Sequence, residues 1–104
     1  MTSLVYGTLF RMRLRAEVSE ERLRAYFERW QAALGPRFPG TALDTLLRVD
    51  GVEREYIALH LFATRAAYGA MDGDAEQDRW YQELVAMLEH EPQFTDVEQV
   101  WRVG

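Results

Sequence analysis

Residues 53–63, EREYIALHLFA, decide the fold, because their pattern is typical of a strand that is buried on both faces. Side chains alternate between the two faces of a strand. One face is aliphatic, with Ile57, Leu59, Leu61 and Ala63. The other face combines aromatic, small and polar side chains, namely Tyr56, Ala58, His60 and Phe62. Neither face is suited to water, so we expect this strand to lie in a sheet that is covered on both sides.

The segments on either side of this strand predict the order βαββαβ. Apolar alternation predicts strands at residues 4–15, 41–49, 53–63 and 97–103, with Asp50-Gly51 as the hairpin signal between the second and the third. One helix is predicted from the N-cap Ser19 to Gly35-Pro36. Another is predicted from Asp74, which fits a capping box with Gln77, to Pro92. A short helix over residues 64–71 is predicted to precede it.

This order predicts one α+β domain of ferredoxin-like type over residues 1–104, with an antiparallel sheet and its helices on one face. The helices would leave the second face of the sheet uncovered. Because residues 53–63 are apolar on that face too, the sheet of a second copy is the simplest cover. The sequence therefore predicts a homodimer.

Composition excludes several classes of function. All twelve basic residues are arginine and the formal net charge is −5, so a nucleic acid is disfavoured as a partner. The chain has no lysine and no cysteine, which excludes a Schiff-base lysine, a P-loop lysine and thiolate chemistry. No apolar run reaches the ~20 residues of a membrane span, and the first residues lack the pattern of a signal peptide. We expect a cytoplasmic protein with no membrane partner.

Few residues remain as candidates for chemistry. The only serines are Ser3 and Ser19, and no G-x-S-x-G motif is present, so a serine hydrolase is disfavoured. His60 and His90 lie thirty positions apart in no metal-binding spacing, so we expect no metal. His60 is the candidate base, because an imidazole titrates near neutral pH. The alternative is a core histidine whose ring is satisfied by a backbone or tyrosine partner.

Residues 62–68 read FATRAAY, and the helix after them carries Trp80-Tyr81. Together with the first strand, the capped helix, Pro39-Gly40 before the second strand and the hairpin, this pattern resembles the antibiotic biosynthesis monooxygenase family. The resemblance covers essentially the whole chain. It implies a dimeric α+β barrel with a pocket between the sheet and the helices and with no cofactor.

The resemblance also implies which residues line the pocket. Tyr68 matches an aromatic residue of the family, whereas Phe62 and Ala58 replace the tryptophan and the asparagine that are frequent in quinone-forming members. Thr8 lies near the place where haem-degrading members have an asparagine, so haem degradation is disfavoured. We expect His60 as the catalytic base and the following residues around a small aromatic substrate: Tyr6, Thr8, Phe10, Trp30, Tyr56, Ala58, Phe62, Tyr68 and Trp80.

Three functions follow as hypotheses. The leading one is a small cofactor-independent monooxygenase of secondary metabolism, acting on molecular oxygen and a phenolic or polyketide-derived aromatic. In it, His60 removes a proton and the hydroxyl of Tyr56 or Tyr6 holds the resulting oxyanion. A non-oxidative polyketide cyclase or isomerase needs the same base and pocket. A non-catalytic ligand-binding dimer is the third hypothesis.

Overall fold

The computed structural model describes residues 5–38, 40–72 and 74–103 of the chain. Its elements are β1 (Tyr6–Arg13), α1 (Glu20–Leu34), the 3-10 turn η1 (Gly35–Arg37), β2 (Thr41–Arg48), β3 (Glu55–Phe62), α2 (Arg65–Asp72), α3 (Ala75–Ala86) and β4 (Gln93–Glu98). The predicted order βαββαβ is confirmed, with the short helix α2 before α3.

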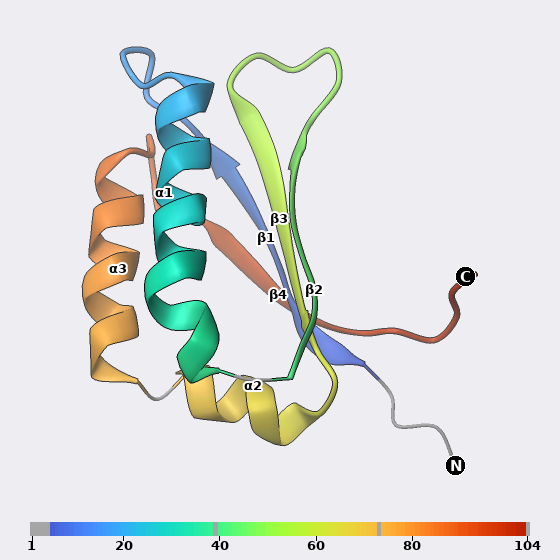
Figure 1. Cartoon of the computed structure of the whole chain (residues 1–104). Helices are drawn as coiled ribbons and strands as arrows, with labels where there is room; N and C mark the ends of the chain where they lie inside the picture. Colours follow the sequence, from blue (N-terminus) through green and yellow to red (C-terminus); the bar gives the residue numbers. More distant parts are fainter. Residues whose placement is uncertain (1–4, 39, 73, 104) are drawn as a thin grey trace.

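The strands form one antiparallel sheet in the order β2-β3-β1-β4. Figure 1 shows α1 and α3 side by side over one face of this sheet, and α2 at the end of the sheet where β3 finishes. This is the ferredoxin-like α+β arrangement that the sequence predicted. It places the central strands β1 and β3 behind the helices, so their inner side chains are available for a core and a site.

The two long helices begin at the predicted caps. Ser19 Oγ accepts a hydrogen bond from the backbone N–H of Arg22 at 3.2 Å, and Asp74 Oδ1 accepts from the N–H groups of Glu76 and Gln77 at 2.9 and 3.2 Å. Such caps satisfy N–H groups that have no partner inside the helix. The Gln77 side chain is used differently from the predicted capping box, because its Oε1 accepts from Trp30 Nε1 at 2.7 Å.

The last strand is the main correction to the predicted elements. It was predicted at residues 97–103 but lies at Gln93–Glu98, where it pairs with β1 from Arg11 to Tyr6. Beyond Glu98 the described part of β1 has no further strand residues to pair with. Val100, Trp101 and Val103 are therefore not in a strand, and their side chains are 90%, 78% and 83% exposed. They lie on the tail that leaves the sheet in Figure 1.

Other bounds differ by small amounts. The first strand begins at Tyr6, and the predicted start at Leu4 lies outside the described residues. It ends at Arg13, although Leu14 still forms an isolated bridge with Leu88. The helix α1 ends at Leu34 as predicted, but Gly35 keeps a right-handed φ of −51° and continues into η1.

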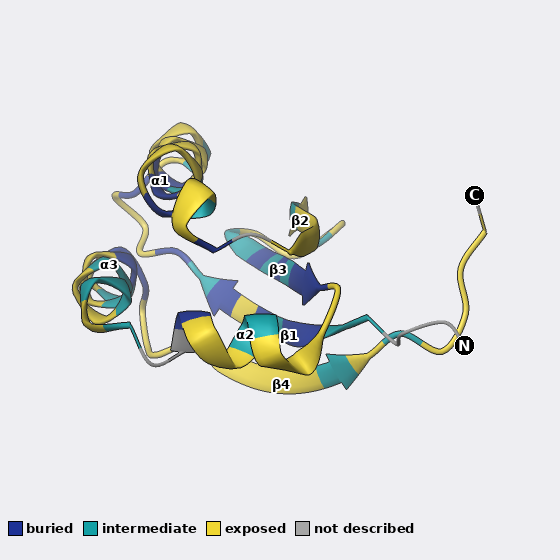
Figure 2. Cartoon of the chain, turned by 60° about the horizontal axis from the view of Figure 1, so that its bottom comes forward, coloured by how far each residue is buried: buried dark blue, intermediate teal, exposed yellow. Residues whose placement is uncertain are grey.

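Buried residues gather between the helices and the sheet, as Figure 2 shows. They form two clusters. One fills the space where Met12 of β1 and the following Leu14 meet Leu23 of α1 and Leu84 of α3. The other, with Trp30, Leu34, Phe38, Phe62 and Met71, lies near α2. The site described below lies between these two clusters.

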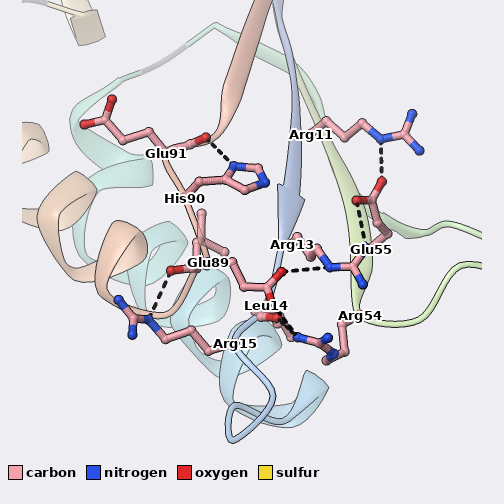
Figure 3. A network of polar contacts seen from close by, with 10 residues as sticks. Arg11, Arg13, Leu14, Arg15, Arg54, Glu55, Glu89, His90 and Glu91 are labelled. Carbon is pink, nitrogen blue, oxygen red and sulfur yellow. Dashed lines mark hydrogen bonds and ion pairs between the residues drawn. The ribbon is translucent and has the colours of Figure 1, made fainter.

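A polar network fixes the opposite end of β1 (Figure 3). Arg54 donates to the carbonyl of Leu14 at 2.7 Å and to Glu89 Oε1 at 3.1 Å. Glu89 also forms an ion pair with Arg13 at 2.8 Å. His90 contacts only the adjacent carbonyl of Glu91 among the described residues. The network ties β1, the hairpin and the chain after α3 together, at a distance from the cavity.

The outer face of the sheet, opposite the helices, has an apolar centre, with Arg11 and Glu55 beside it as an ion pair. It carries Leu9 of β1, Leu43 and Leu47 of β2, and Ile57 and Leu59 of β3, as strand register requires. Leu43 and Leu47 are 44% and 49% exposed. None of the described helices lies over this face (Figure 1).

Candidate active site

A cavity of about 410 Å³ lies between the inner face of the sheet and the helices α1 and α3. Seven of its fifteen lining residues are aromatic, namely Phe10, Tyr26, Phe27, Trp30, Tyr68, Tyr81 and Phe94. Its polar residues are Thr8, Asp44, His60, Asp74, Gln77 and Asp78. A flat wall with a few polar groups suits a small aromatic ligand.

His60 is held in this wall by two aromatic rings. Its side chain is only 8% exposed. The imidazole stacks on Phe62 with ring centroids 4.6 Å apart, and Trp30 meets it edge-on at 5.1 Å. Burial lowers the pKa of His60 below its usual 6.5, because burial penalises the charged form, while the nearby carboxylate of Asp44 opposes this effect. The imidazole is thereby biased towards its neutral form, which can accept a proton.

The Nε2 atom of His60 is buried and has no hydrogen-bond partner among the described residues. This differs from the alternative that the sequence left open, in which a backbone or tyrosine partner satisfies the ring at that atom. A buried polar atom without a partner costs about 1–3 kcal/mol. Its position in a cavity wall is therefore a feature that points to a ligand.

Asp44 is the nearest charged group to His60. It lies on the edge strand β2 directly opposite His60 in the β2–β3 register. Its Oδ2 atom is 3.9 Å from His60 Nε2, and its side chain is 25% exposed. Burial raises the pKa of Asp44, and the attraction of a charged His60 would lower it. The two groups therefore titrate as a pair.

The same register continues across the sheet as a row of polar side chains. Thr8 of β1 lies opposite His60 on one side and Asp96 of β4 on the other. Thr8 Oγ1 donates to the carbonyl of Thr95 at 3.3 Å, and the Tyr68 hydroxyl donates to Asp96 Oδ1 at 3.3 Å. We call Asp44, His60, Thr8 and Asp96 the polar row.

Gly7 permits the close approach of β1 to β3 beside His60. It pairs with Leu61, and a Cβ atom built on it would collide with the backbone carbonyl of His60. Only glycine fits at that position without moving β3. The position of His60 thus depends on a residue of the neighbouring strand.

The structure brings five of the predicted site residues together around the cavity: Thr8, Phe10, Trp30, His60 and Tyr68. Phe62 lies behind them, fully buried under His60 and 5.8 Å from the Tyr68 ring. Tyr6 packs against Tyr68 at 5.4 Å without lining the cavity. Ala58 and Trp80 belong to or pack against the core cluster.

Tyr56 is not brought to the cavity. It is four residues from His60 on β3, which places it about 13 Å away along the strand. Its hydroxyl donates to Glu20 Oε1 at 2.8 Å, beside the ion pair of Glu20 with Arg48. Tyr56 therefore lines a separate hollow that also contains Arg24 and Leu46. The structure does not place it to hold an oxyanion formed next to His60.

Several lining residues were missed by sequence reasoning. Asp44 had a signal, because it is the only charged residue in the otherwise apolar run 41–47, TALDTLL. A second sequence signal was helical spacing, which places four further lining residues on one face at the start of α3: Asp74, Gln77, Asp78 and Tyr81. The remaining lining residues showed no sequence signal beyond their apolar or aromatic character: Tyr26, Phe27, Met71, Leu84 and Phe94.

The described residues offer no other kind of centre. They contain no group of three or more histidine, aspartate or glutamate side chains that could hold a metal ion. Among them, no helix combines the length and the apolar character that crossing a bilayer requires. The fold and the cavity together define a ferredoxin-like α+β protein with a partly aromatic cavity between its sheet and its helices.

The sequence matches no family model and no curated protein. Solved structures are similar along nearly the whole chain. A candidate antibiotic biosynthesis monooxygenase from Caulobacter crescentus has a TM-score of 0.78 at 16% identity, covering 96% of this chain and 93% of that one. A variant of SnoaB, a cofactor-independent oxygenase from Streptomyces nogalater, has a TM-score of 0.72 at 19% identity, covering 98% and 96%.

A dimeric ferredoxin-like protein of unknown function from Jannaschia sp. is similar as well, with a TM-score of 0.72 at 20% identity, covering 92% of this chain and 99% of that one. The chain therefore has the fold of the antibiotic biosynthesis monooxygenases, in agreement with the resemblance seen in the sequence.

Proposed function

We propose that the protein is a small cofactor-independent oxygenase acting on a phenolic or polyketide-derived aromatic, with His60 as its general base. The observation that carries this proposal is the buried, unpartnered Nε2 atom of a histidine in the wall of an aromatic cavity. The fold shared with SnoaB, a cofactor-independent oxygenase, supports the reaction class.

In the proposed reaction His60 removes a proton from an acidic carbon or hydroxyl of the substrate. The resulting anion is electron-rich and reduces molecular oxygen, so that the substrate supplies the electrons. One oxygen atom replaces two hydrogen atoms at a substrate carbon as a new carbonyl, and the other leaves as water. The aromatic wall excludes bulk water from the anion.

Replacement of His60 tests this role. We expect His60→Gln to lower oxygen consumption with an anthrone substrate by about 100-fold or more, the range for removal of a general base. An oxygen electrode measures the rate, and circular dichroism verifies folding. His90→Gln is the matched control, because His90 is the other histidine and lies exposed at the opposite end of the sheet. A folded His60→Gln protein with the wild-type rate would refute the role of His60.

The same base and cavity would serve a non-oxidative cyclase or isomerase. The assay without oxygen separates the two reactions, because only the oxygenase then stops. Product formation that continues without oxygen would favour the cyclase. Binding without any turnover in either condition would favour the ligand-binding protein.

We also propose that the protein works as a homodimer that buries the outer face of the sheet. That face carries Leu9, Leu43, Leu47, Ile57 and Leu59, and no described helix covers it. An apolar face of this kind in a small domain needs cover. The similar protein from Jannaschia sp. is itself named as dimeric.

A further inference from the structure

The gap between His60 and Asp44 has a specific size. The Nε2–Oδ2 distance of 3.9 Å exceeds the 2.7–3.2 Å of an ordinary hydrogen bond, so the two groups do not satisfy each other. Among the described residues, His60 Nε2 has no hydrogen-bond partner, and the carboxylate of Asp44 contacts His60 alone. Both atoms belong to side chains that line the cavity.

A single oxygen atom of a ligand that entered this gap would reach both groups at once, and because Nε2 is buried it would have to displace a neighbouring side chain to do so. If it lies about 2.8 Å from Nε2 and from Oδ2, the two contacts meet at an angle of about 90°, which a hydroxyl group tolerates. A bridging position of this kind is too close to both groups for an apolar ligand atom to use well. The cavity therefore has one point at which a polar ligand atom gains two hydrogen bonds.

The chemistry of the pair determines which polar group fits there. Burial raises the pKa of Asp44 and lowers that of His60, so a proton shared by the pair can lie on the carboxyl group, which then donates while the imidazole accepts. If the proton moves to His60, the imidazolium donates and the carboxylate accepts. In both of these states the pair shares one proton and offers one donor and one acceptor. A hydroxyl group can accept from the donor and donate to the acceptor, whereas an ionised carboxylate can only accept.

The other charged groups of the cavity do not favour an anion. Asp74 is paired with Arg37 at 2.6 Å and caps α3, so it is compensated. Asp78 is exposed at the cavity and has no ion pair among the described residues. No arginine lines the cavity in the part of the chain that the structure describes. An anion that entered would lose its hydration without gaining a permanent cation.

We propose that His60 Nε2 and Asp44 Oδ2 form a seat for one neutral hydroxyl group, so that the cavity takes uncharged aromatic alcohols and discriminates against aromatic carboxylates. This inference deepens the proposed function, on which it rests for the identity of the site. It makes Asp44 a substrate-contacting residue that determines specificity, in place of the tyrosines expected from the sequence.

Three probes of similar shape test the seat by binding alone. They are 2-naphthol, which is neutral and carries a hydroxyl group, 2-naphthoate, which is an anion at pH 7, and 2-methylnaphthalene, which is apolar. We expect the wild-type protein to bind 2-naphthol at least about tenfold more tightly than 2-naphthoate, as measured by NMR titration. Equal affinities, a preference for 2-naphthoate or no binding of 2-naphthol would overturn the proposal.

The variant Asp44→Val removes one side of the seat. We expect it to weaken 2-naphthol binding by about tenfold, the value of one hydrogen bond at the upper end of its range. Binding of 2-methylnaphthalene should change less than about twofold. The matched control is Thr45→Val, one residue away with its side chain on the outer face. An Asp44→Val protein that binds 2-naphthol like the control would overturn the role of Asp44.

These outcomes are distinct from those of the oxygen assay. A protein that shows the tenfold preference but consumes no oxygen would retain the hydroxyl seat and lose the proposed oxygenase activity. A protein that consumes oxygen but binds 2-naphthol and 2-naphthoate equally would support the oxygenase activity and overturn the hydroxyl seat.

Discussion

At the scale of single residues, the unusual feature is a buried histidine beside a carboxyl group inside an aromatic wall. Stacking on Phe62 and the edge contact with Trp30 fix the ring of His60. Its Nε2 atom nevertheless remains without a partner among the described residues. A phenylalanine at this position could make the same packing contacts. The imidazole is therefore best explained by a hydrogen bond to a bound ligand.

The pKa shift of His60 predicts how activity depends on pH. A general base acts in its neutral form, and burial lowers the pKa of His60 below 6.5. The acid limb of the kcat/KM profile should therefore have its midpoint below pH 6.5, with activity retained as the pH falls through that value. The Asp44 carboxylate raises the pKa of His60, so Asp44→Asn should move this midpoint to still lower pH. A midpoint above 6.5, or an upward shift in the variant, would contradict the assignment.

The sequence allowed His60 and part of the aromatic wall to be predicted, because strand alternation fixes which side chains share a face of β3. It marked Asp44 as the only charged residue of 41–47 but did not show that its side chain shares the face of His60. Simple alternation from Thr41 would put Leu43 on the same face and Asp44 on the opposite one. A register shift between Thr41 and Leu43 brings Asp44 opposite His60 instead. A bulge of this kind arises from strand pairing and leaves no clear local signal.

At the scale of elements, the helix α3 contributes both stability and part of the cavity. Its N-cap Asp74 binds two backbone N–H groups and pairs with Arg37. Its next turns present Gln77, Asp78 and Tyr81 to the cavity. The start of the helix thus determines where these side chains lie.

Removal of the two helix caps separates these roles. We expect Asp74→Ala and Ser19→Ala each to lower the free energy of unfolding by about 1 kcal/mol, the usual value of an N-cap. Chemical denaturation measures both losses. Only Asp74→Ala should also weaken binding of 2-naphthol, because α3 borders the cavity at its first turns whereas Ser19 lies outside it. Equal effects of the two variants on binding would show that the position of α3 does not shape the site.

The elements also show where sequence patterns mislead. The helices and the first three strands were predicted within a few residues, since their caps and apolar spacing are local. The last strand was misplaced by several residues, because Trp101 and Val103 look more strand-like than Gln93, Thr95 and Asp96. Its true position depends on β1, which pairs it from Arg11 to Tyr6. Pairing across a long chain separation overrode local propensity.

At the scale of the whole molecule, the two faces of the sheet have different roles. The inner face builds the core and the cavity, and the outer face has an apolar centre that none of the described helices covers. Val100, Trp101 and Val103 add exposed apolar side chains on the tail that follows β4. A second copy would bury both regions.

A charge on the outer face should separate the dimer. We expect Leu59→Glu to shift the protein from dimer to monomer, because Leu59 lies at the centre of that face, opposite Leu9 and Thr45. Analytical ultracentrifugation measures the mass in solution. Ala32→Glu introduces the same charge on the exposed side of α1 and should leave the dimer intact. A wild-type protein that sediments as a monomer would refute the dimer itself.

The polar row gives the molecule a further property, because it draws one residue from each strand of the sheet. A slip of β2 by one position would turn Asp44 to the outer face and replace it by an apolar neighbour. A ligand held by both His60 and Asp44 would therefore act as a cross-link between the edge strand and the strand beside it. Ligand binding at the seat and the correct register of β2 on β3 would be thermodynamically linked, so a chain with β2 out of register would not bind the ligand.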